Sequence, residues 1–286
     1  MRSTILVRCL DSRSPVREGE LIETALSIAR EAAGAAAIQI AGGRPCSVNK
    51  KGAVDLVTEI DLAAEQAIRD VLHERSPEIP VLAEEGGGAH DASTRWIVDP
   101  LDGTTNFVHG FPCYGPSIAL QLDGVVVACC TLNVATGESF WARQGGGAWS
   151  ESGRLKVSDA RSLSEALLIT GFPYDRRQRA DFYLSFLRAF MVAGQGIRRD
   201  GAAAVDFTHI ASGRADGFWE FGLQPWDVAA GSLLVTEAGG QISNPAGGML
   251  ELDRPQIIAS NGWIHDEMTQ ICADLLEAQG SKWHLQ

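Results

Sequence analysis

Residues 96–107 read WIVDPLDGTTNF, and the rest of the chain is organised around this stretch. Residues 96–98 are apolar and predict a short buried strand. Asp99 and Pro100 should end that strand, because proline has no N–H to continue a ladder. Asp102 follows three positions after Asp99, so both carboxylates should lie at the sheet edge and converge on one point. Carboxylates that approach each other repel, which predicts a cation between them.

The residues after Asp102 suggest an anion site beside this cation. Gly103, Thr104 and Thr105 predict the start of a helix, where free N–H groups favour phosphate or another anion. Oxygen ligands for a hard metal next to such a site are the minimum requirement for metal-assisted hydrolysis of a phosphate ester. The simpler alternative for Asp-x-x-Asp-Gly alone is an acidic turn that caps a helix.

The spacing of the two acids also separates this chain from the haloacid-dehalogenase-like phosphatases. Those enzymes carry Asp-x-Asp-Gly-Thr, with one residue between the acids. Here Pro100 and Leu101 intervene, so the second carboxylate points elsewhere. The spacing therefore argues against a mechanism that passes through an aspartyl phosphate.

The composition is that of an ordinary globular protein. Of its 286 residues 45% are hydrophobic and 21% charged. A net charge of −12 and a pI near 4.9 provide no electrostatic footprint for nucleic acid or an anionic membrane. The six cysteines show no C-x-x-C pairing and predict reduced thiols. We find no convincing targeting segment and expect a cytoplasmic protein.

The first half predicts an antiparallel sheet and two helices. Residues 1–17 read as a polar, mobile leader. The expected elements are a helix over 18–41, a second helix from Asp61 to Ser76, strands over 80–83 and 139–143, and a hairpin over 117–122 and 125–134. The strand over 80–83 delivers Glu84 and Glu85, of which only one can face a shared site because adjacent side chains on an extended chain point to opposite sides.

The second half alternates strands and helices more regularly. The expected strands cover 166–170, 216–220 and 256–260, and the helices 179–193, 202–211, 226–238 and 264–278. We therefore expect two packed halves, residues 18–155 and 156–286, with an active site in the cleft between them. Taken alone, Asp61 could be a helix N-cap, Asp227 a helix-dipole acid and Glu220 a solvated acid at a strand end.

Three separated blocks carry a resemblance to a known family. They are residues 55–61 with Glu84 and Glu85, residues 96–107, and residues 226–231 followed by 236–240. With these blocks the chain resembles the inositol monophosphatase family over about residues 18–280. The resemblance implies an α+β fold layered α/β/α/β/α, often dimeric, and hydrolysis of a phosphate monoester that depends on two to three Mg²⁺ ions.

The resemblance also implies roles for individual residues. Matched positions give the metal ligands as Glu84, Asp99, the Leu101 carbonyl, Asp102 and Asp227, with Asp99 bridging two ions. All-oxygen ligands of this kind suit Mg²⁺. Asp61 and Thr104 match the pair that orients the attacking water. On the substrate side the matched positions are Gly103 and Thr104, which donate N–H groups to phosphate, Glu220, which faces substrate hydroxyls, Gly201 and Ala203 opposite it, and Arg198, which either assists or makes a dimer contact.

The substrate remains a choice between close alternatives. The Thr-Thr-Asn sequence after Gly103 favours inositol 1-phosphate or a similar polyol monophosphate, whereas histidinol phosphatases and fructose-1,6-bisphosphatases share the same metal core. The alternative outside enzymes is a metal-binding regulatory protein. We expect a homodimer inhibited by Li⁺, and neither a nucleic acid nor a membrane partner.

Overall fold

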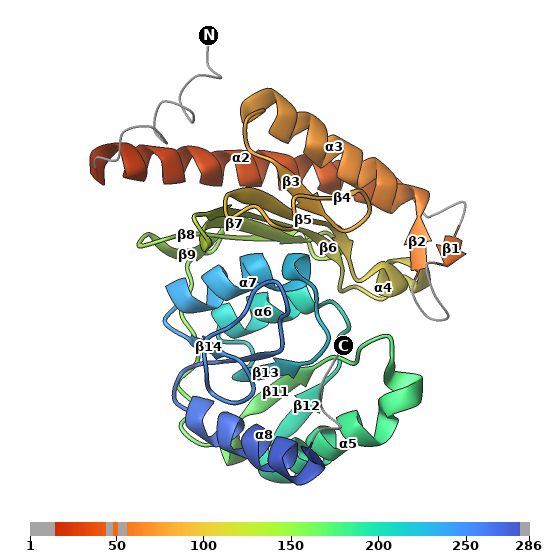
Figure 1. Ribbon diagram of the computed structural model, residues 1–286, viewed down its shortest axis with the longest axis vertical. Helices are drawn as coiled ribbons and strands as arrows, with labels where there is room; N and C mark the ends of the chain where they lie inside the picture. Colours follow the sequence, from red (N-terminus) through yellow and green to blue (C-terminus); the bar gives the residue numbers. More distant parts are fainter. Residues whose placement is uncertain (1–14, 44–47, 51–55, 281–286) are drawn as a thin grey trace.

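The computed structural model describes residues 15–43, 48–50 and 56–280 as five layers (Figure 1). Two helices cover the outer face of a large sheet, two more lie between this sheet and a smaller one, and a last pair covers the smaller sheet. This is the α/β/α/β/α arrangement that the resemblance implied. In order of layer the helices are α2 (Pro15–Ala41), α3 (Glu59–Arg75), α6 (Ala203–Ala211), α7 (Pro225–Glu237), α5 (Arg176–Ala193) and α8 (His265–Gln279).

The large sheet has eight strands in the order β10-β9-β8-β7-β6-β5-β3-β4. Its strands are β3 (Val81–Ala83), β4 (Gly87–Gly88), β5 (Arg95–Asp102), β6 (Gly115–Leu122), β7 (Val125–Asn133), β8 (Glu138–Arg143), β9 (Gly147–Ser150) and β10 (Gly153–Arg154). Every pair is antiparallel except β3 with β5, which is parallel. The predicted hairpin is confirmed, since Leu122 pairs with Val125 across a two-residue turn.

The small sheet has five strands in the order β12-β11-β13-β15-β14. Its strands are β11 (Leu167–Thr170), β12 (Gly196–Arg198), β13 (Gly217–Glu220), β14 (Gln241–Ser243) and β15 (Ile257–Ser260). The sequence did not predict β12 and β14, which are edge strands of three residues each. The remaining elements are β1 (Val48–Lys50), β2 (Leu56–Thr58), α4 (Thr104–His109) and the 3₁₀ helix η1 (Leu163–Glu165).

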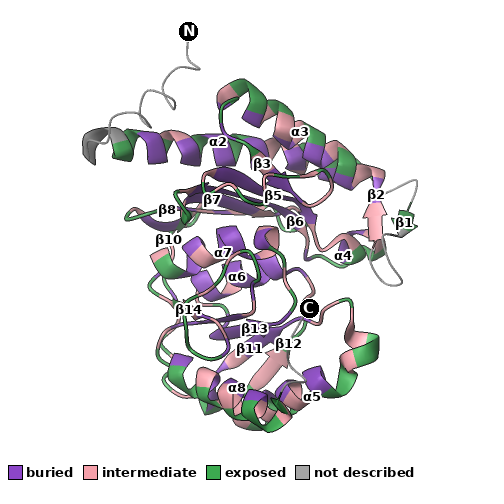
Figure 2. Cartoon of the chain, viewed as in Figure 1, coloured by how far each residue is buried: buried purple, intermediate pink, exposed green. Residues whose placement is uncertain are grey.

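Buried residues gather where successive layers face each other (Figure 2), and their side chains form clusters between the layers. One cluster packs α2 and α3 against the large sheet, and the predicted apolar face of α2 is buried there at Leu21, Ala25, Ile28, Ala32 and Ala36. A second cluster joins side chains of the large sheet to those of α6, α7 and the small sheet. Because this cluster mixes residues from before and after position 155, the two predicted halves share one continuous core.

Among the predicted boundaries that differ from the structure, two concern the leader and the central strand. Helix α2 begins at Pro15, so residues 15–17 of the predicted leader are helical, while residues 1–14 lie outside the described chain. Strand β5 does not end at Asp99 and Pro100 but continues to Asp102. The pairing of β5 with β6 shifts register between Asp99 and Asp102, and such an irregularity tolerates proline because no regular ladder bond is lost there. None of the described helices combines the length and apolar character that a membrane span requires.

The packing of α6 against α7 predicts a strong effect of one methyl group. A Cβ added at Gly231 of α7 would lie 2.2 Å from the Phe207 ring of α6. Gly231→Ala should therefore lower the free energy of unfolding by about 1–3 kcal/mol through overpacking. Gly34→Ala in α2 is the control, because its Cβ would meet nothing within 4 Å. That change should be neutral or stabilise by about 0.5–1 kcal/mol. Equal stability of both variants in urea unfolding would contradict this close approach.

Candidate active site

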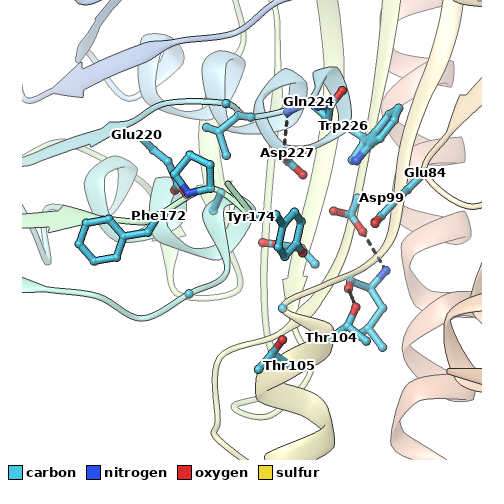
Figure 3. Close-up of a pocket in the computed structure, with 18 of the residues that line it drawn as sticks. Glu84, Asp99, Thr104, Thr105, Phe172, Tyr174, Glu220, Gln224, Trp226 and Asp227 are labelled. Carbon is cyan, nitrogen blue, oxygen red and sulfur yellow. Dashed lines mark hydrogen bonds between the residues drawn. The ribbon is translucent and has the colours of Figure 1, made fainter. Parts of the chain in front are cut away.

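A cavity of about 450 Å³ is lined by residues from both halves of the chain (Figure 3). The first half contributes Glu84, Asp99, Leu101, Asp102, Gly103, Thr104 and Thr105. The second half contributes Phe172, Pro173, Tyr174, Arg176, Arg199, Gly201, Ala203, Glu220, Gly222, Leu223, Gln224, Trp226 and Asp227. All five predicted metal-ligand positions therefore line one cavity.

Parallel pairing of β3 and β5 brings the first two acids together. Ala83 pairs with Val98, and the Glu84 N–H donates to the Val98 carbonyl at 3.2 Å. Glu84, which directly follows the end of β3, is thus brought beside Asp99 within the neighbouring strand β5. Glu84 lines the cavity and Glu85 does not, as the alternation of side chains predicted.

Asp102 connects the end of β5 to the beginning of α6. Its Oδ2 accepts a hydrogen bond of 2.7 Å from the Ala204 N–H. The residue at the N-cap of α6 is Ala202, which makes no side-chain cap bond. The carboxylate of Asp102 therefore satisfies a free N–H of this helix from a strand more than ninety positions earlier, and it benefits from the positive end of the helix dipole.

The carboxyl groups of Asp227 and Asp99 are also held by short local contacts. Asp227 lies in the first turn of α7, where its Oδ2 accepts the Gln224 N–H at 2.7 Å. The Asp99 Oδ1 accepts the Leu101 N–H at 3.0 Å. Asp227 therefore lies where an acid interacts favourably with the dipole of α7, and it also lines the cavity. Its interpretation as a helix-dipole acid is compatible with its interpretation as a metal ligand.

Asp61 and Thr104 are brought into contact across 43 positions of sequence. The Thr104 hydroxyl lies 2.9 Å from Asp61 Oδ1 and 3.1 Å from the Leu101 carbonyl oxygen. Asp61 Oδ2 accepts the N–H and the hydroxyl of Thr58, at 2.8 and 2.6 Å. Asp61 is therefore not the N-cap of α3, which is Thr58, but the acid of a capping box, and its second oxygen is directed to Thr104.

Gly103 has a conformation and surroundings that exclude other residues. Its φ is +81°, and an added Cβ would lie 2.8 Å from the Cys113 carbonyl oxygen and 3.0 Å from the Ala202 Cβ. A side chain here would push β5 away from the start of α6. Glycine is therefore required for Asp102 and Thr104 to face the cavity on either side of it.

The acids of the cavity repel one another. Burial, followed by the charges of Glu84, Asp102 and Asp227, raises the pKa of Asp99 well above its usual range. Burial and then Asp102 do the same to the pKa of Asp227. Burial raises the pKa of Asp102 to about 6, although four backbone N–H groups oppose the shift. A divalent cation would relieve this repulsion and restore the ionised forms.

The donor set suits such a cation, although it is not a closed coordination shell. Among the described residues no group of three His, Cys, Asp or Glu side chains converges closely enough to hold an ion as placed. Figure 3 shows Glu84 and Asp99 on one wall and Asp227 on another. The backbone bonds to Asp99, Asp102 and Asp227 each use one carboxylate oxygen as principal acceptor. The second carboxylate oxygens of Asp99 and Asp227 are available to a hard ion that prefers oxygen ligands.

Glu220 lies at the far end of the cavity from Thr104. It ends β13, as predicted, and its residue is only 8% exposed. Burial raises the pKa of Glu220 to about 8, with Arg199 opposing the shift and Asp102 adding to it. Gly171 makes room for it, because a Cβ at that position would lie 2.1 Å from both carboxylate oxygens.

The structure places Arg199 in the cavity, whereas Arg198, the predicted residue, is exposed and lies outside the lining. Arg198 ends strand β12, and its Nη1 donates to the Ile197 carbonyl. Adjacent residues on an extended chain point to opposite sides, so the alternation that distinguished Glu84 from Glu85 also applies here. Gly201 and Ala203 line the cavity as predicted. The sequence did not indicate the segment 172–174, which lies in a connection without a motif, or Arg176, the first residue of α5.

The chain is similar to proteins of known family. The sequence profile of the inositol monophosphatase family matches residues 18–279. The chain is 45% identical over 221 residues to Nus factor SuhB of Pseudomonas aeruginosa, spanning 75% of this chain and 82% of the relative. It is 40% identical over 273 residues to an inositol-1-monophosphatase of Synechocystis, spanning 92% and 93%. The solved inositol monophosphatase from Anabaena superposes with a TM-score of 0.82 at 37% identity, over 90% of this chain and 98% of that one.

The raised pKa values predict how stability depends on pH without metal. A carboxyl whose pKa is raised by folding holds protons that the unfolded chain releases, so stability falls as pH rises from the unfolded value to the folded one. For Glu220 that window runs from 4.5 to about 8. In EDTA the Tm should therefore fall between about pH 5 and pH 8, and Glu220→Gln should flatten this fall. Mg²⁺ should raise the Tm more at the higher pH, because its ligands must be deprotonated.

Glu74→Gln is the matched control for this titration, because Glu74 is an exposed carboxylate on α3. It removes the same charge without removing a buried group, so the pH dependence of its Tm should follow that of the wild type. A Tm of the metal-free wild type that does not change over this range, by scanning fluorimetry, would contradict the raised pKa values.

Proposed function

This chain belongs to the inositol monophosphatase family of phosphatases, and we propose that it hydrolyses a polyol monophosphate with Mg²⁺ as its cofactor. Inositol 1-phosphate, or a compound of similar shape, is the proposed substrate. The observation that supports this most directly is one cavity that is lined by Glu84, Asp99 and Asp227 together with Thr104. It combines acidic oxygen ligands with a group that can orient water.

Five groups would hold two to three Mg²⁺ ions. They are the carboxylates of Glu84, Asp99, Asp102 and Asp227 and the carbonyl of Leu101, all of which belong to residues that line the cavity. Bound there, Mg²⁺ would supply positive charge to the phosphate oxygens and the leaving oxygen and would make a nearby water more acidic. Gly103 and Thr104 would offer backbone N–H groups to the phosphate at the start of α4.

Asp61 and Thr104 would orient the attacking water. The Thr104 hydroxyl has one proton, and it donates a hydrogen bond of 2.9 Å to Asp61 Oδ1 with that proton. The Thr104 oxygen then keeps lone pairs with which to accept a hydrogen bond from water, so the water oxygen is turned toward phosphorus. The water oxygen would bond to phosphorus as the bond from phosphorus to the ester oxygen breaks, and one proton of the water would end on the leaving oxygen, giving the alcohol and inorganic phosphate with no covalent phospho-enzyme.

Glu220 would read the substrate's hydroxyl groups. A carboxylate accepts hydrogen bonds from a polyol, and the small residues Gly201 and Ala203 leave space opposite it. Arg176 and Arg199 line the same cavity, and they favour one alternative, a substrate with a second phosphate such as fructose 1,6-bisphosphate. Histidinol phosphate is the third candidate. We place the monophosphate first because Glu220, in the ionised form that bound Mg²⁺ nearby would favour, would repel a second phosphate bound beside it.

A second role is supported by the names of relatives. Proteins called Nus factor SuhB occur among the similar proteins, at 45% identity for the one from Pseudomonas aeruginosa. We therefore propose a binding role beside catalysis as the second candidate function. A variant that is inactive in hydrolysis but restores the wild-type phenotype to a strain in which the gene for this protein has been deleted would establish it. The proposal further includes a cytoplasmic location and a homodimer. It also includes inhibition by Li⁺, because the same acidic site would bind this ion.

Asp99→Asn tests the proposed metal chemistry. Removal of a bridging charge should lower kcat by at least about 10³-fold and weaken Mg²⁺ binding, since several kcal/mol of transition-state stabilisation would be lost. The metal-free variant should be more stable than the metal-free wild type, because one repelling carboxylate is gone. Asp91→Asn, an exposed site, is the control and should match wild type. Near-normal turnover of Asp99→Asn with bound Mg²⁺ would contradict the assignment.

Glu220→Gln tests the proposed substrate class. Loss of a charged hydrogen bond should weaken turnover of inositol 1-phosphate by about ten- to a hundred-fold. An aryl phosphate without hydroxyl groups should be hydrolysed at the wild-type rate, which provides the internal control. Equal losses on both substrates would make Glu220 a structural residue. A wild-type preference for fructose 1,6-bisphosphate or histidinol phosphate would reject the substrate and leave the metal chemistry intact.

A further inference from the structure

Glu65 is a buried acid outside the cavity, on the face of α3 that is turned toward the turn between β3 and β4. Its residue is 5% exposed. Its carboxylate accepts the Glu85 N–H at 2.9 Å and the Gly86 N–H at 3.0 and 3.2 Å, one distance to each oxygen. The turn that begins at Glu84 is therefore bound by a charged group on a helix about twenty positions earlier in the sequence.

Arg69 completes this contact one helical turn later. Its Nε donates to Glu65 Oε1 at 2.7 Å, and its Nη2 donates to the Gly87 carbonyl at 3.3 Å. The guanidinium thus holds the carboxylate in one orientation and also contacts the end of the turn. It compensates the negative charge of Glu65, which would otherwise add to the charge of the acids nearby. We call Glu65 and Arg69 together the α3 clamp.

The turn approaches the clamp so closely that a side chain at its third position would displace the clamp residues. A Cβ added at Gly86 would lie 2.5 Å from Glu65 Oε1 and 2.6 Å from Arg69 Nη2. Both distances are too short for a real contact. The sequence Glu84-Glu85-Gly86 is therefore matched to the clamp as well as to the cavity.

The clamp and strand β5 together fix Glu84 from both sides. The Glu84 N–H is bound to the Val98 carbonyl, and the next two N–H groups are bound to Glu65. Glu84 faces Asp99, and the repulsion between the two carboxylates would push the turn away from β5. We propose that Glu65, supported by Arg69, is a positioning residue that holds Glu84 against this repulsion so that it can bind a cation with Asp99. This inference rests on the proposed function, in which Glu84 is a metal ligand.

A carboxylate is the group that this contact requires. It can accept two backbone N–H groups and the Arg69 guanidinium at once, because it has two oxygens and no donor. Glutamine has almost the same shape but offers one oxygen, and its NH₂ group would face an N–H or the guanidinium. Glu65→Gln should therefore loosen the turn without removing bulk from the interior.

The test is Mg²⁺ binding to Glu65→Gln by isothermal titration calorimetry, together with the Mg²⁺ dependence of phosphate release. We expect the Kd for Mg²⁺ to rise about 10- to 100-fold, the range typical when the groups that orient a ligand are changed. At saturating Mg²⁺ kcat should return to within about threefold of wild type, because the ligands and Thr104 are still present. A purely structural role would lower the Tm and leave the Kd for Mg²⁺ unchanged.

Glu74→Gln is the matched control, since Glu74 is an exposed acid on the same helix. It should leave Mg²⁺ binding at the wild-type value. Glu84→Gln is the reference for loss of the ligand itself and should weaken Mg²⁺ binding with no recovery of kcat. If Glu84→Gln weakens binding and Glu65→Gln does not, the clamp is refuted and the proposed function stands. If neither changes binding, Glu84 is not a ligand and both assignments fall.

Gly86→Ala tests the same contact from the other side and replaces Glu65→Gln should that variant fail to fold. The added methyl group displaces the carboxylate of Glu65 and the guanidinium of Arg69 while the clamp residues themselves are unchanged. We expect the same rise in the Kd for Mg²⁺ and the same recovery of kcat at high Mg²⁺. Wild-type Mg²⁺ affinity in Gly86→Ala would overturn the proposal.

Discussion

Repulsion among the carboxylates that line one cavity is the constraint around which this structure is built. Parallel pairing of β3 with β5 places Glu84 beside Asp99, and each acid raises the energy of its neighbour's ionised form. Backbone N–H groups bind one oxygen of Asp99, Asp102 and Asp227, so the chain itself fixes these acids in place. The apolar clusters between the layers must offset the strain of this arrangement, which is characteristic of functional sites.

Asp102 shows why the two halves cannot be separated from the site. It stands at the end of β5 in the first half and binds the first turn of α6 in the second. That helix lacks a capping side chain of its own, and it packs against α7 within the cluster shared by both sheets. A change at Asp102 would therefore alter a proposed metal ligand and a helix start together. The side chain of Asp99 is bonded, within the described part of the chain, only to the Leu101 N–H of its own strand, so Asp99 gives the cleaner test of the chemistry.

The sequence predicted residues whose position follows from local rules. The Asp123-Gly124 turn, the apolar face of α2 and the choice of Glu84 over Glu85 all depend on periodicity or turn chemistry, and the structure agrees with each. It did not predict that β5 continues past Pro100, because the register shift involves the neighbouring strand β6. The sequence did not indicate Arg199, because the position of strand β12 decides which of the two adjacent arginine side chains faces the cavity. The segment 172–174 faces the cavity only through tertiary packing.

The cavity divides into parts with different degrees of freedom. The acids at one end project from strand and helix ends whose backbone is fixed by ladders, caps and, for Glu84, by Glu65. Tyr174, Arg176 and Arg199 line the same cavity but belong to connections or to the first turn of a helix that bears no acid of the cavity. Such positions can change without disturbing the acids. In the proposed function, metal-dependent hydrolysis and the choice of substrate would therefore be set by separable groups, and a shared acidic core would not by itself determine which ester is hydrolysed.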